Sequence, residues 1–358
     1  MGSIFIGLYY WDILFVIYLS LSCWLYIRDF KTYRINLPTF YKLNILFILY
    51  AALVTVNAYR YLDSVSDLII SSLYLLRWSL YMFSGIVLFL DLKSAKIDYK
   101  FVKNLIIGEG VLISIFGFLQ LIFLSDFTTL DKSLMWDPHL NRLAGLYFDP
   151  NFAGIILVLI LSVLTSDILN LFESKKVKSA KKLILNITGF LIIFSAIILT
   201  FSRSAWLALA VVILVMGIIK FKWIIPIALL GMFLVYYAIP RVQTRISGVT
   251  DPSDSFYYRV ISWTETYEIA KQNPIIGYGF NTYRYIRRDL GLIKYDEGLG
   301  DRADSGSDSS LLFVWVTTGL IGLSIYLIAN IKLFFQSLNR AKLDNLGLMF
   351  TAILISLL

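Results

Sequence analysis

Residues 152–172, FAGIILVLILSVLTSDILNLF, form a run of 21 residues with a single charged side chain. A helix of about 20 apolar residues crosses the hydrocarbon core of a membrane, because it satisfies its backbone hydrogen bonds internally. Comparable runs recur from one end of the chain to the other. They predict an all-α, polytopic integral membrane helix bundle of about ten transmembrane helices. The predicted spans are residues 4–27, 43–59, 68–90, 105–125, 152–172, 183–201, 205–219, 223–239, 309–331 and 346–358.

The composition agrees with a membrane fold. Hydrophobic residues make up 58% of the 358 positions, against about 45–50% in soluble domains. Since the apolar runs continue throughout, we predict one polytopic membrane domain over residues 1–358. The first run is too long for the apolar region of a signal peptide, so we predict that it is a span.

Cysteine and histidine usage limits the chemistry. The chain has one cysteine, Cys23, and one histidine, His139, which excludes a disulfide framework and a Cys/His metal cluster. No metal or other cofactor is expected, and His139 is interpreted as a solvated loop residue. The formal charge of +8 does not indicate a nucleic-acid partner, because most basic residues lie in short loops between the apolar runs.

Those basic loops predict the orientation, since cytoplasmic loops retain Lys and Arg. One set of alternate loops carries eighteen basic residues, whereas the short loops of the other set carry four. The N-terminus and the long polar loop at residues 240–307 are therefore predicted on the extracytoplasmic side.

The long outer loop is predicted to contain an amphipathic helix. Its apolar residues are spaced four, three, four and three apart, as on one helical face. The sequence from Pro274 to Gly279 follows. We interpret it as a compact turn, although its Gly-x-Gly pattern is also a weak signal for phosphate binding. The residues of the predicted apolar face are Phe256, Val260, Trp263, Tyr267 and Ala270.

Arginines recur at the predicted outer ends of the spans. A single arginine there is explained as well by snorkelling to lipid headgroups as by function. A cluster of guanidinium groups suits a diphosphate, which it binds through charge-assisted bidentate hydrogen bonds. Each such bond contributes about 1.5–3 kcal/mol. The arginines concerned are Arg142, Arg203, Arg241, Arg245 and Arg259.

Other charged residues leave alternatives open. Asp308 directly precedes the ninth predicted span, where it is either the N-cap of that helix or a functional carboxylate, and Asp304 lies nearby. Within the spans, Asp12, Arg77 and Glu109 are costly unless they are paired. An ion pair between Arg77 and Glu109 is favoured over an ion pathway.

Several short patterns between residues 140 and 325 occur in a characteristic order. They are Arg142–Ala153, Thr200-Phe-Ser-Arg-Ser204, Arg259 with Trp263, the turn Asn273–Gly279, and Asp308-Ser-Ser-Leu-Leu312 followed by Thr318–Gly322. Together they resemble the O-antigen ligase and Wzy-type polymerase superfamily. The resemblance implies a metal-independent, inverting glycosyltransferase that acts on polyprenyl-diphosphate-linked glycans at the outer face of the bacterial cytoplasmic membrane.

The resemblance also implies residue roles. Arg203 and Arg259 would bind the diphosphate leaving group as catalytic residues, and Arg142 would shape the same pocket. In the family's ligases a histidine before the equivalent of the ninth span is assigned as the base, and this sequence has Asp308 there, with Asp304 as a second candidate. The other residues predicted to bind substrate are Asn151, Arg241 and Arg245.

Because that histidine is absent, a polymerase of lipid-linked repeat units is favoured over a ligase. The expected partners are the glycan donor, the glycan acceptor and membrane lipid, and a flippase and a chain-length regulator are candidates. Two other classes stay open. Asp12, Arg77 and Glu109 would suit a transporter or channel, and the chain would also suit a non-catalytic member of an envelope-assembly complex.

Overall fold

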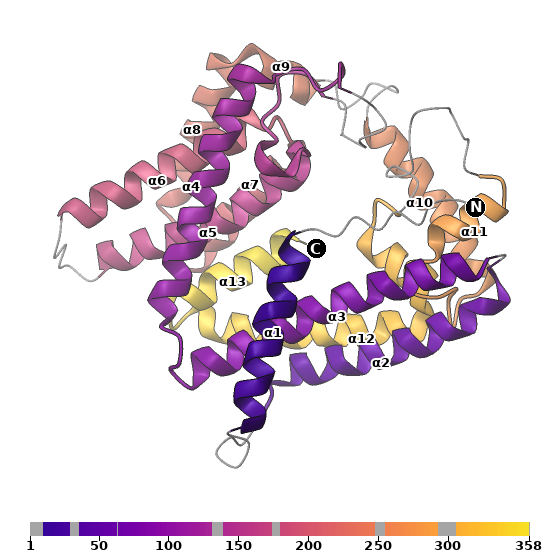
Figure 1. The fold of residues 1–358 in the computed structure, drawn as a ribbon. Helices are drawn as coiled ribbons and strands as arrows, with labels where there is room; N and C mark the ends of the chain where they lie inside the picture. Colours follow the sequence, from indigo (N-terminus) through magenta and orange to yellow (C-terminus); the bar gives the residue numbers. More distant parts are fainter. Residues whose placement is uncertain are drawn as a thin grey trace. The chain divides into compact units, whose positions relative to one another are not determined.

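The computed structural model of the chain is helical and divides into two compact units (Figure 1). The first unit comprises residues 1–98 and 255–333, and the second comprises residues 99–254 and 334–358. Each unit has its own core. The structure describes residues 10–28, 36–62, 64–130, 139–173, 180–247, 255–292 and 306–357.

Each of the ten predicted spans corresponds to a helix, and the described residues contain no β-strand, so the predicted fold class is confirmed. Three further helices follow the eighth predicted span: α9 (Pro240–Ser247), α10 (Ser255–Gln272) and α11 (Tyr283–Asp289). The helices at the predicted spans are α1 (Tyr10–Arg28), α2 (Thr39–Asn57), α3 (Val65–Lys93), α4 (Tyr99–Phe123), α5 (Pro150–Glu173), α6 (Ala180–Leu199), α7 (Arg203–Ile219), α8 (Ile224–Ala238), α12 (Ser310–Ala341) and α13 (Asn345–Ser356).

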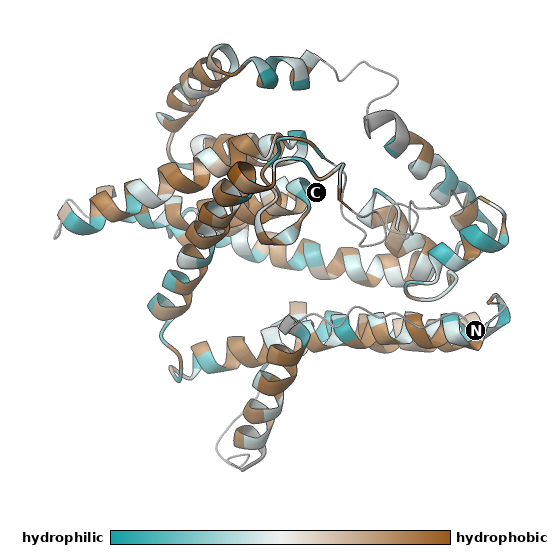
Figure 2. Ribbon diagram, turned by 45° about the horizontal axis from the view of Figure 1, so that its top comes forward, coloured by the Kyte–Doolittle hydropathy of each residue, from teal (hydrophilic) through white to brown (hydrophobic). Residues whose placement is uncertain are grey.

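Fewer helices have the full length of a span than the sequence predicts. By length and composition, six described helices can cross a membrane, namely α2 to α6 and α12. A seventh is added if α8 and α9, which meet at a bend of 101°, count as one broken span. Helices α1, α7 and α13 are apolar but shorter. In Figure 2 the apolar colour runs along the helices, and hydrophilic residues are frequent near their ends.

The first unit is held together around α2, α3 and α12. Phe47 and Ala51 of α2 and Leu75 of α3 are buried together, and Tyr326 of α12 packs against them. The rings of Phe47 and Tyr326 lie 6.1 Å apart. This packing joins helices that are distant in the sequence.

Helix α12 is interrupted where the turn after α10 docks against it. Gly319 has φ 64° and ψ −174°, which is outside the helical region. The turn supplies the missing backbone partners: Leu320 N donates to Pro274 O at 2.8 Å, and Gly279 N donates to Thr317 O at 2.8 Å. The compact-turn interpretation of Pro274–Gly279 therefore agrees with the structure, and the turn satisfies backbone groups that the break exposes.

The second unit is built on α5, whose inner face is almost wholly buried. Leu157, Leu161 and Leu164 of α5 have no more than 1% of their surface exposed and contact α6, α7 and α13 through one hydrophobic core. Close approach of α5 to α7 requires small residues, because a Cβ at Gly154 would lie 2.7 Å from the Cβ of Ala205.

The helix predicted in the long polar loop is present as α10, and its buried face matches the prediction only in part, at Ala270. Val260 and Tyr267, which we predict on the apolar face, are 40% and 45% exposed. The buried residues are Thr266, Ile269 and Ala270, because this stripe faces α11 and α12. The Thr266 hydroxyl is hydrogen-bonded to the Tyr283 hydroxyl at 2.7 Å. The buried face of α10 therefore includes a polar pair, whereas the apolar spacing predicts aromatic rings there.

The charges within the spans are arranged differently from the prediction. Arg77 of α3 forms an ion pair of 3.0 Å with Asp12 of α1, which also accepts a hydrogen bond from Tyr81. Asp12 is the partner that the structure assigns to Arg77, and the favoured pair with Glu109 was wrong. Glu109 belongs to the second unit and accepts a hydrogen bond from Tyr147 at 3.5 Å.

Candidate functional site

In the second unit, the connection between α6 and α7 is a tight turn of three residues, Thr200, Phe201 and Ser202. Phe201 has φ 48°, in the left-handed region, and reverses the chain. Ser202 caps α7 by accepting a hydrogen bond from Ala205 N at 3.4 Å. Arg203 is therefore the first residue of α7, where the helix dipole favours an anion.

Arg142 is bonded to this turn. Its Nε donates to the carbonyl oxygen of Thr200 at 2.9 Å, and its Nη2 donates to Asn151 Oδ1 at 3.0 Å. The guanidinium thus joins the segment before α5, the first turn of α5 and the α6–α7 turn. Lysine has no planar fork with which to make both bonds.

Asn151 completes the connection. Its Oδ1 also accepts a hydrogen bond from Ser202 Oγ at 2.9 Å, and Ser202 Oγ is 3.0 Å from Ser204 Oγ. Asp149 fixes the start of α5 by accepting from the Asn151 backbone N–H at 2.7 Å. Asn151 is consequently a positioning residue for the turn.

Arg241, at the start of α9, lies over the same turn. Its guanidinium carbon is 4.4 Å from the centre of the Phe201 ring, and its terminal nitrogens donate to the carbonyl oxygens of Leu140 and Asn141. Burial lowers the pKa of Arg241, and the charge of Arg245 lowers it further. An anion placed beside these two residues would relieve their repulsion.

His139 differs from its predicted state as a solvated loop residue. It is 4% exposed and stacks on Phe127, with 4.2 Å between the ring centres. Neither ring nitrogen has a hydrogen-bond partner among the described residues. Burial, followed by the charge of Arg142, lowers its pKa to about 4, so the imidazole is neutral at pH 7.

In the first unit, Arg259 and Asp308 lie at one end of α10 and α12. The backbone N–H of Asp308 contacts Ser262 Oγ at 3.5 Å. Ser262 is one helical turn after Arg259 on α10, so the two residues share a face. Arg259 is half-buried and Asp308 is exposed.

The N-cap alternative for Asp308 is not what the structure shows. Ser309 Oγ accepts a hydrogen bond from Leu312 N at 3.4 Å and fills that position at the start of α12. The Asp308 carboxylate is thus not used as the cap of this helix. Asp304 lies outside the described residues.

The structure adds a pair of charges that the sequence analysis does not single out. Arg287 of α11 forms an ion pair of 2.9 Å with Glu265 of α10, and its guanidinium lies 5.7 Å from the centre of the Tyr283 ring. In the sequence, Arg287 belongs to a basic run that is typical of a solvated helix face. The contact between α10 and α11 shows instead that Arg287 forms an ion pair within the first unit.

The predicted site residues fall into two described sets. In the second unit, four of them lie at the α6–α7 turn and Arg245 is near enough to Arg241 to lower its pKa. In the first unit, Asp308 contacts Ser262, which is one helical turn after Arg259. The described residues contain no group of three or more His, Cys, Asp or Glu side chains placed to hold a metal ion. The first set is Arg142, Asn151, Arg203, Arg241 and Arg245, and the second is Arg259 and Asp308.

These features define the class: a multi-pass helical membrane protein with arginines gathered on a short connection between two helices. Residues 188–327, somewhat less than half of the chain, match the family model described as O-antigen ligase. This match agrees with the resemblance carried by the motifs and supports membership of the O-antigen ligase and Wzy superfamily. The search of curated proteins finds no match.

Proposed function

We propose that the protein is a membrane glycosyltransferase that polymerises polyprenyl-diphosphate-linked oligosaccharide units of an O antigen, capsule or exopolysaccharide. The reaction would take place at the outer face of the cytoplasmic membrane. The family match supports a ligase-type or polymerase-type function in an O-antigen pathway. The observation that carries the finer proposal is the arrangement of Arg142, Arg203 and Arg241 around one helix-capping turn.

The chemistry is a single displacement with inversion and without a metal ion. A hydroxyl oxygen of the acceptor sugar attacks the anomeric carbon of the donor, and the bond from that carbon to the diphosphate oxygen breaks. The diphosphate leaves with the electron pair. Arg203 is assigned to neutralise the charge that develops on it, which stabilises the transition state electrostatically. The resemblance assigns the same role to Arg259.

The proton of the attacking hydroxyl is assigned to a carboxylate. Asp308 is the first candidate because it is exposed at the head of α12 and does not cap that helix. A carboxylate accepts this proton as a general base if it lies within hydrogen-bond distance of the hydroxyl. Asp304 is the second candidate.

A polymerase and a ligase differ in the acceptor, so purified protein should be given lipid-linked repeat units alone. A ladder of longer lipid-linked glycans is expected from a polymerase. Transfer that occurs only after a second acceptor is added would instead identify a ligase, which is the activity that the name of the matching family gives. Absence of product in both reactions with folded protein would contradict the enzymatic proposal.

Arginine geometry is tested by a charge-preserving change. Arg203→Lys is expected to lower the rate of transfer at least tenfold, because lysine binds phosphate as a point charge and cannot bind it in a bidentate manner. Arg60→Lys, at an exposed arginine after α2, is the matched control and should leave the rate unchanged. Wild-type rates for Arg203→Lys would indicate that this arginine only meets lipid headgroups.

A further inference from the structure

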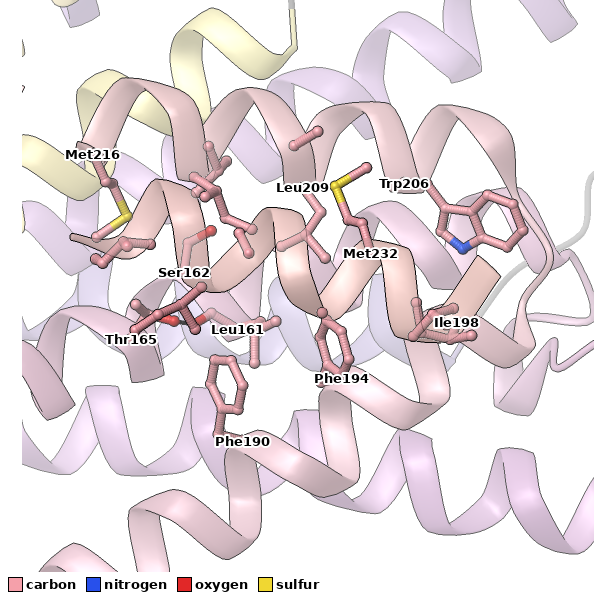
Figure 3. A pocket seen from close by; sticks show the side chains of 18 of the residues that line it. Leu161, Ser162, Thr165, Phe190, Phe194, Ile198, Trp206, Leu209, Met216 and Met232 are labelled. Carbon is pink, nitrogen blue, oxygen red and sulfur yellow. Dashed lines mark hydrogen bonds between the residues drawn. The ribbon is translucent and has the colours of Figure 1, made fainter. Parts of the chain in front are cut away.

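The second unit contains an apolar cavity of about 310 Å³ between α5, α6, α7, α8 and α9 (Figure 3). Its volume lies within the range of about 300–1,000 Å³ that is usual for ligand pockets. The hydroxyl groups that α5 contributes to its wall are satisfied within that helix: Ser162 donates to Val158 O and Thr165 donates to Leu161 O, both at 2.7 Å. The cavity therefore suits hydrocarbon.

Helix α8 forms the loosest wall of this cavity. None of its residues is buried, although the helix is apolar throughout. Gly231 of α8 lines the cavity, and a Cβ added there would meet no atom within 4 Å. Met232, also from α8, is drawn in Figure 3 among the side chains that line the cavity.

Helix α9 covers one end of the cavity and has two distinct stripes. Val242 and Ile246, four residues apart, line the cavity. Arg241 and Arg245, also four residues apart, form the neighbouring stripe, and Arg241 contacts Phe201 of the α6–α7 turn. An apolar chain inside the cavity would thus end directly beside a cluster of guanidinium groups.

We propose that this cavity binds the first isoprene units of a prenyl diphosphate, with the diphosphate on Arg241, Arg245 and the α6–α7 turn. The inference rests on the proposed function and adds the place where the lipid of the donor is held. A prenyl diphosphate matches the site better than a bilayer phospholipid, because it combines one chain with two adjacent phosphates. The aromatic residues Phe190, Phe194 and Trp206 in the wall suit its unsaturated, methyl-branched chain.

The test fills the cavity without touching the arginines. Gly231→Phe places a ring in the open space, and Gly108→Phe, at another open glycine on α4 that does not line the cavity, is the matched control. The probe is a sugar-free prenyl diphosphate with a photoreactive group in its chain, added to the purified full-length protein. Labelled residues are mapped by mass spectrometry, and thermal melting confirms that each variant is folded.

Labelling of α7 and α8 residues is expected in the wild type and in Gly108→Phe, with a loss of at least tenfold in Gly231→Phe. Ala228→Leu, which also narrows the cavity, should reduce labelling if Gly231→Phe fails to fold. Undiminished labelling in the filled variants would overturn the proposal. So would equal labelling of the same residues by a phospholipid with the photoreactive group in its acyl chain.

The outcome is separable from that of the proposed function. If the cavity is labelled by the prenyl diphosphate but the protein forms no glycan product, the binding inference stands and the proposed reaction fails. If the protein forms product and the filled variants retain both labelling and rate, the proposed reaction stands and the cavity is not the binding site.

Discussion

The carbonyl oxygen of Ile275 lies against Gly319 so closely that a Cβ on Gly319 would collide with it. The same contact brings Gly277, with φ 79°, to the break in α12, where its own Cβ would be 2.5 Å from Gly319 N. Both glycines are thus required by the docking of one backbone segment on another. The patterns Asn273–Gly279 and Thr318–Gly322 are two halves of a single contact.

We predict that Gly319→Ala destabilises the protein by at least about 2 kcal/mol, because a side chain is strained at φ 64° and ψ −174° and also meets the Ile275 backbone. The melting temperature in detergent should fall clearly. Gly108→Ala is the control: its Cβ meets nothing within 4 Å, and helix propensity predicts a slight gain of about 0.5–1 kcal/mol. Equal melting temperatures for the two variants would show that the break in α12 is not fixed by Gly319.

A second prediction concerns the coupling of Arg142 to Asn151. Arg142→Lys should lower both stability and rate of transfer, because it removes at least one of two charge-assisted hydrogen bonds, each worth about 1.5–3 kcal/mol. Asn151→Ala should do the same. In the double variant the losses should be less than additive, as measured by a double-mutant cycle. Strictly additive losses would mean that the two residues act independently.

His139 predicts a dependence of local stability on pH. Its pKa is lowered from 6.5 to about 4 in the folded protein, so between these values the unfolded segment binds more protons than the folded one. The contribution of the buried neutral ring is complete above about pH 6.5 and is lost as the pH falls towards 4. Hydrogen exchange of residues 139–149 should therefore be faster at pH 5 than at pH 7 after correction for intrinsic rates.

His139→Phe is the matched variant, since a phenyl ring retains the stacking on Phe127 and cannot bind a proton. The charged groups that act on His139 are Arg142, Asp149, Arg241 and Asp126, and all four remain in this variant. The difference between pH 5 and pH 7 should be strongly reduced. An unchanged difference would assign it to the carboxylates instead.

Substitutions at Asp308 and Ser309 should have different effects, the first on turnover and the second on stability. Asp308→Asn is expected to lower the turnover by about 10²–10⁴-fold, as is usual for loss of a general base, with little change in melting temperature. Ser309→Ala removes the cap of α12 and should cost about 0.5–2 kcal/mol while transfer continues. Normal turnover in Asp308→Asn would transfer the proposed role to Asp304.

The fold class followed from the sequence because lipid imposes a simple rule of length and polarity on each run. The same rule could not predict the interruption of α12, because Gly319 lies within an apolar run that is typical of one continuous helix. It also located the buried face of α10 only in part. Ala270 is buried as predicted, whereas Val260 and Tyr267 are exposed and the helix packs through Thr266 and Ile269 as well.

Of the candidate site, the sequence predicted the arginines as a group but not their different structural roles. Arg142 is engaged with Thr200 and Asn151, whereas Arg203 begins a helix and Arg241 lies over Phe201. The burial of His139 was missed, because a histidine beside a proline in a polar loop gives no signal of the ring that will cover it. Such long-range contacts depend on chain reversals at residues like Phe201.

The interruption at Gly319 also makes the N-terminal part of α12 a short separate helical segment, with Asp308 just before its first residue. The Pro274–Gly279 turn is hydrogen-bonded to the C-terminal end of this segment. The direction of the segment is therefore set by backbone bonds about ten residues away from the carboxylate. In the proposed reaction the Asp308 carboxylate accepts a proton from the acceptor sugar, and these distant backbone contacts set its position. A change at Gly277 should therefore move the carboxylate without altering a side chain that is assigned to the substrate.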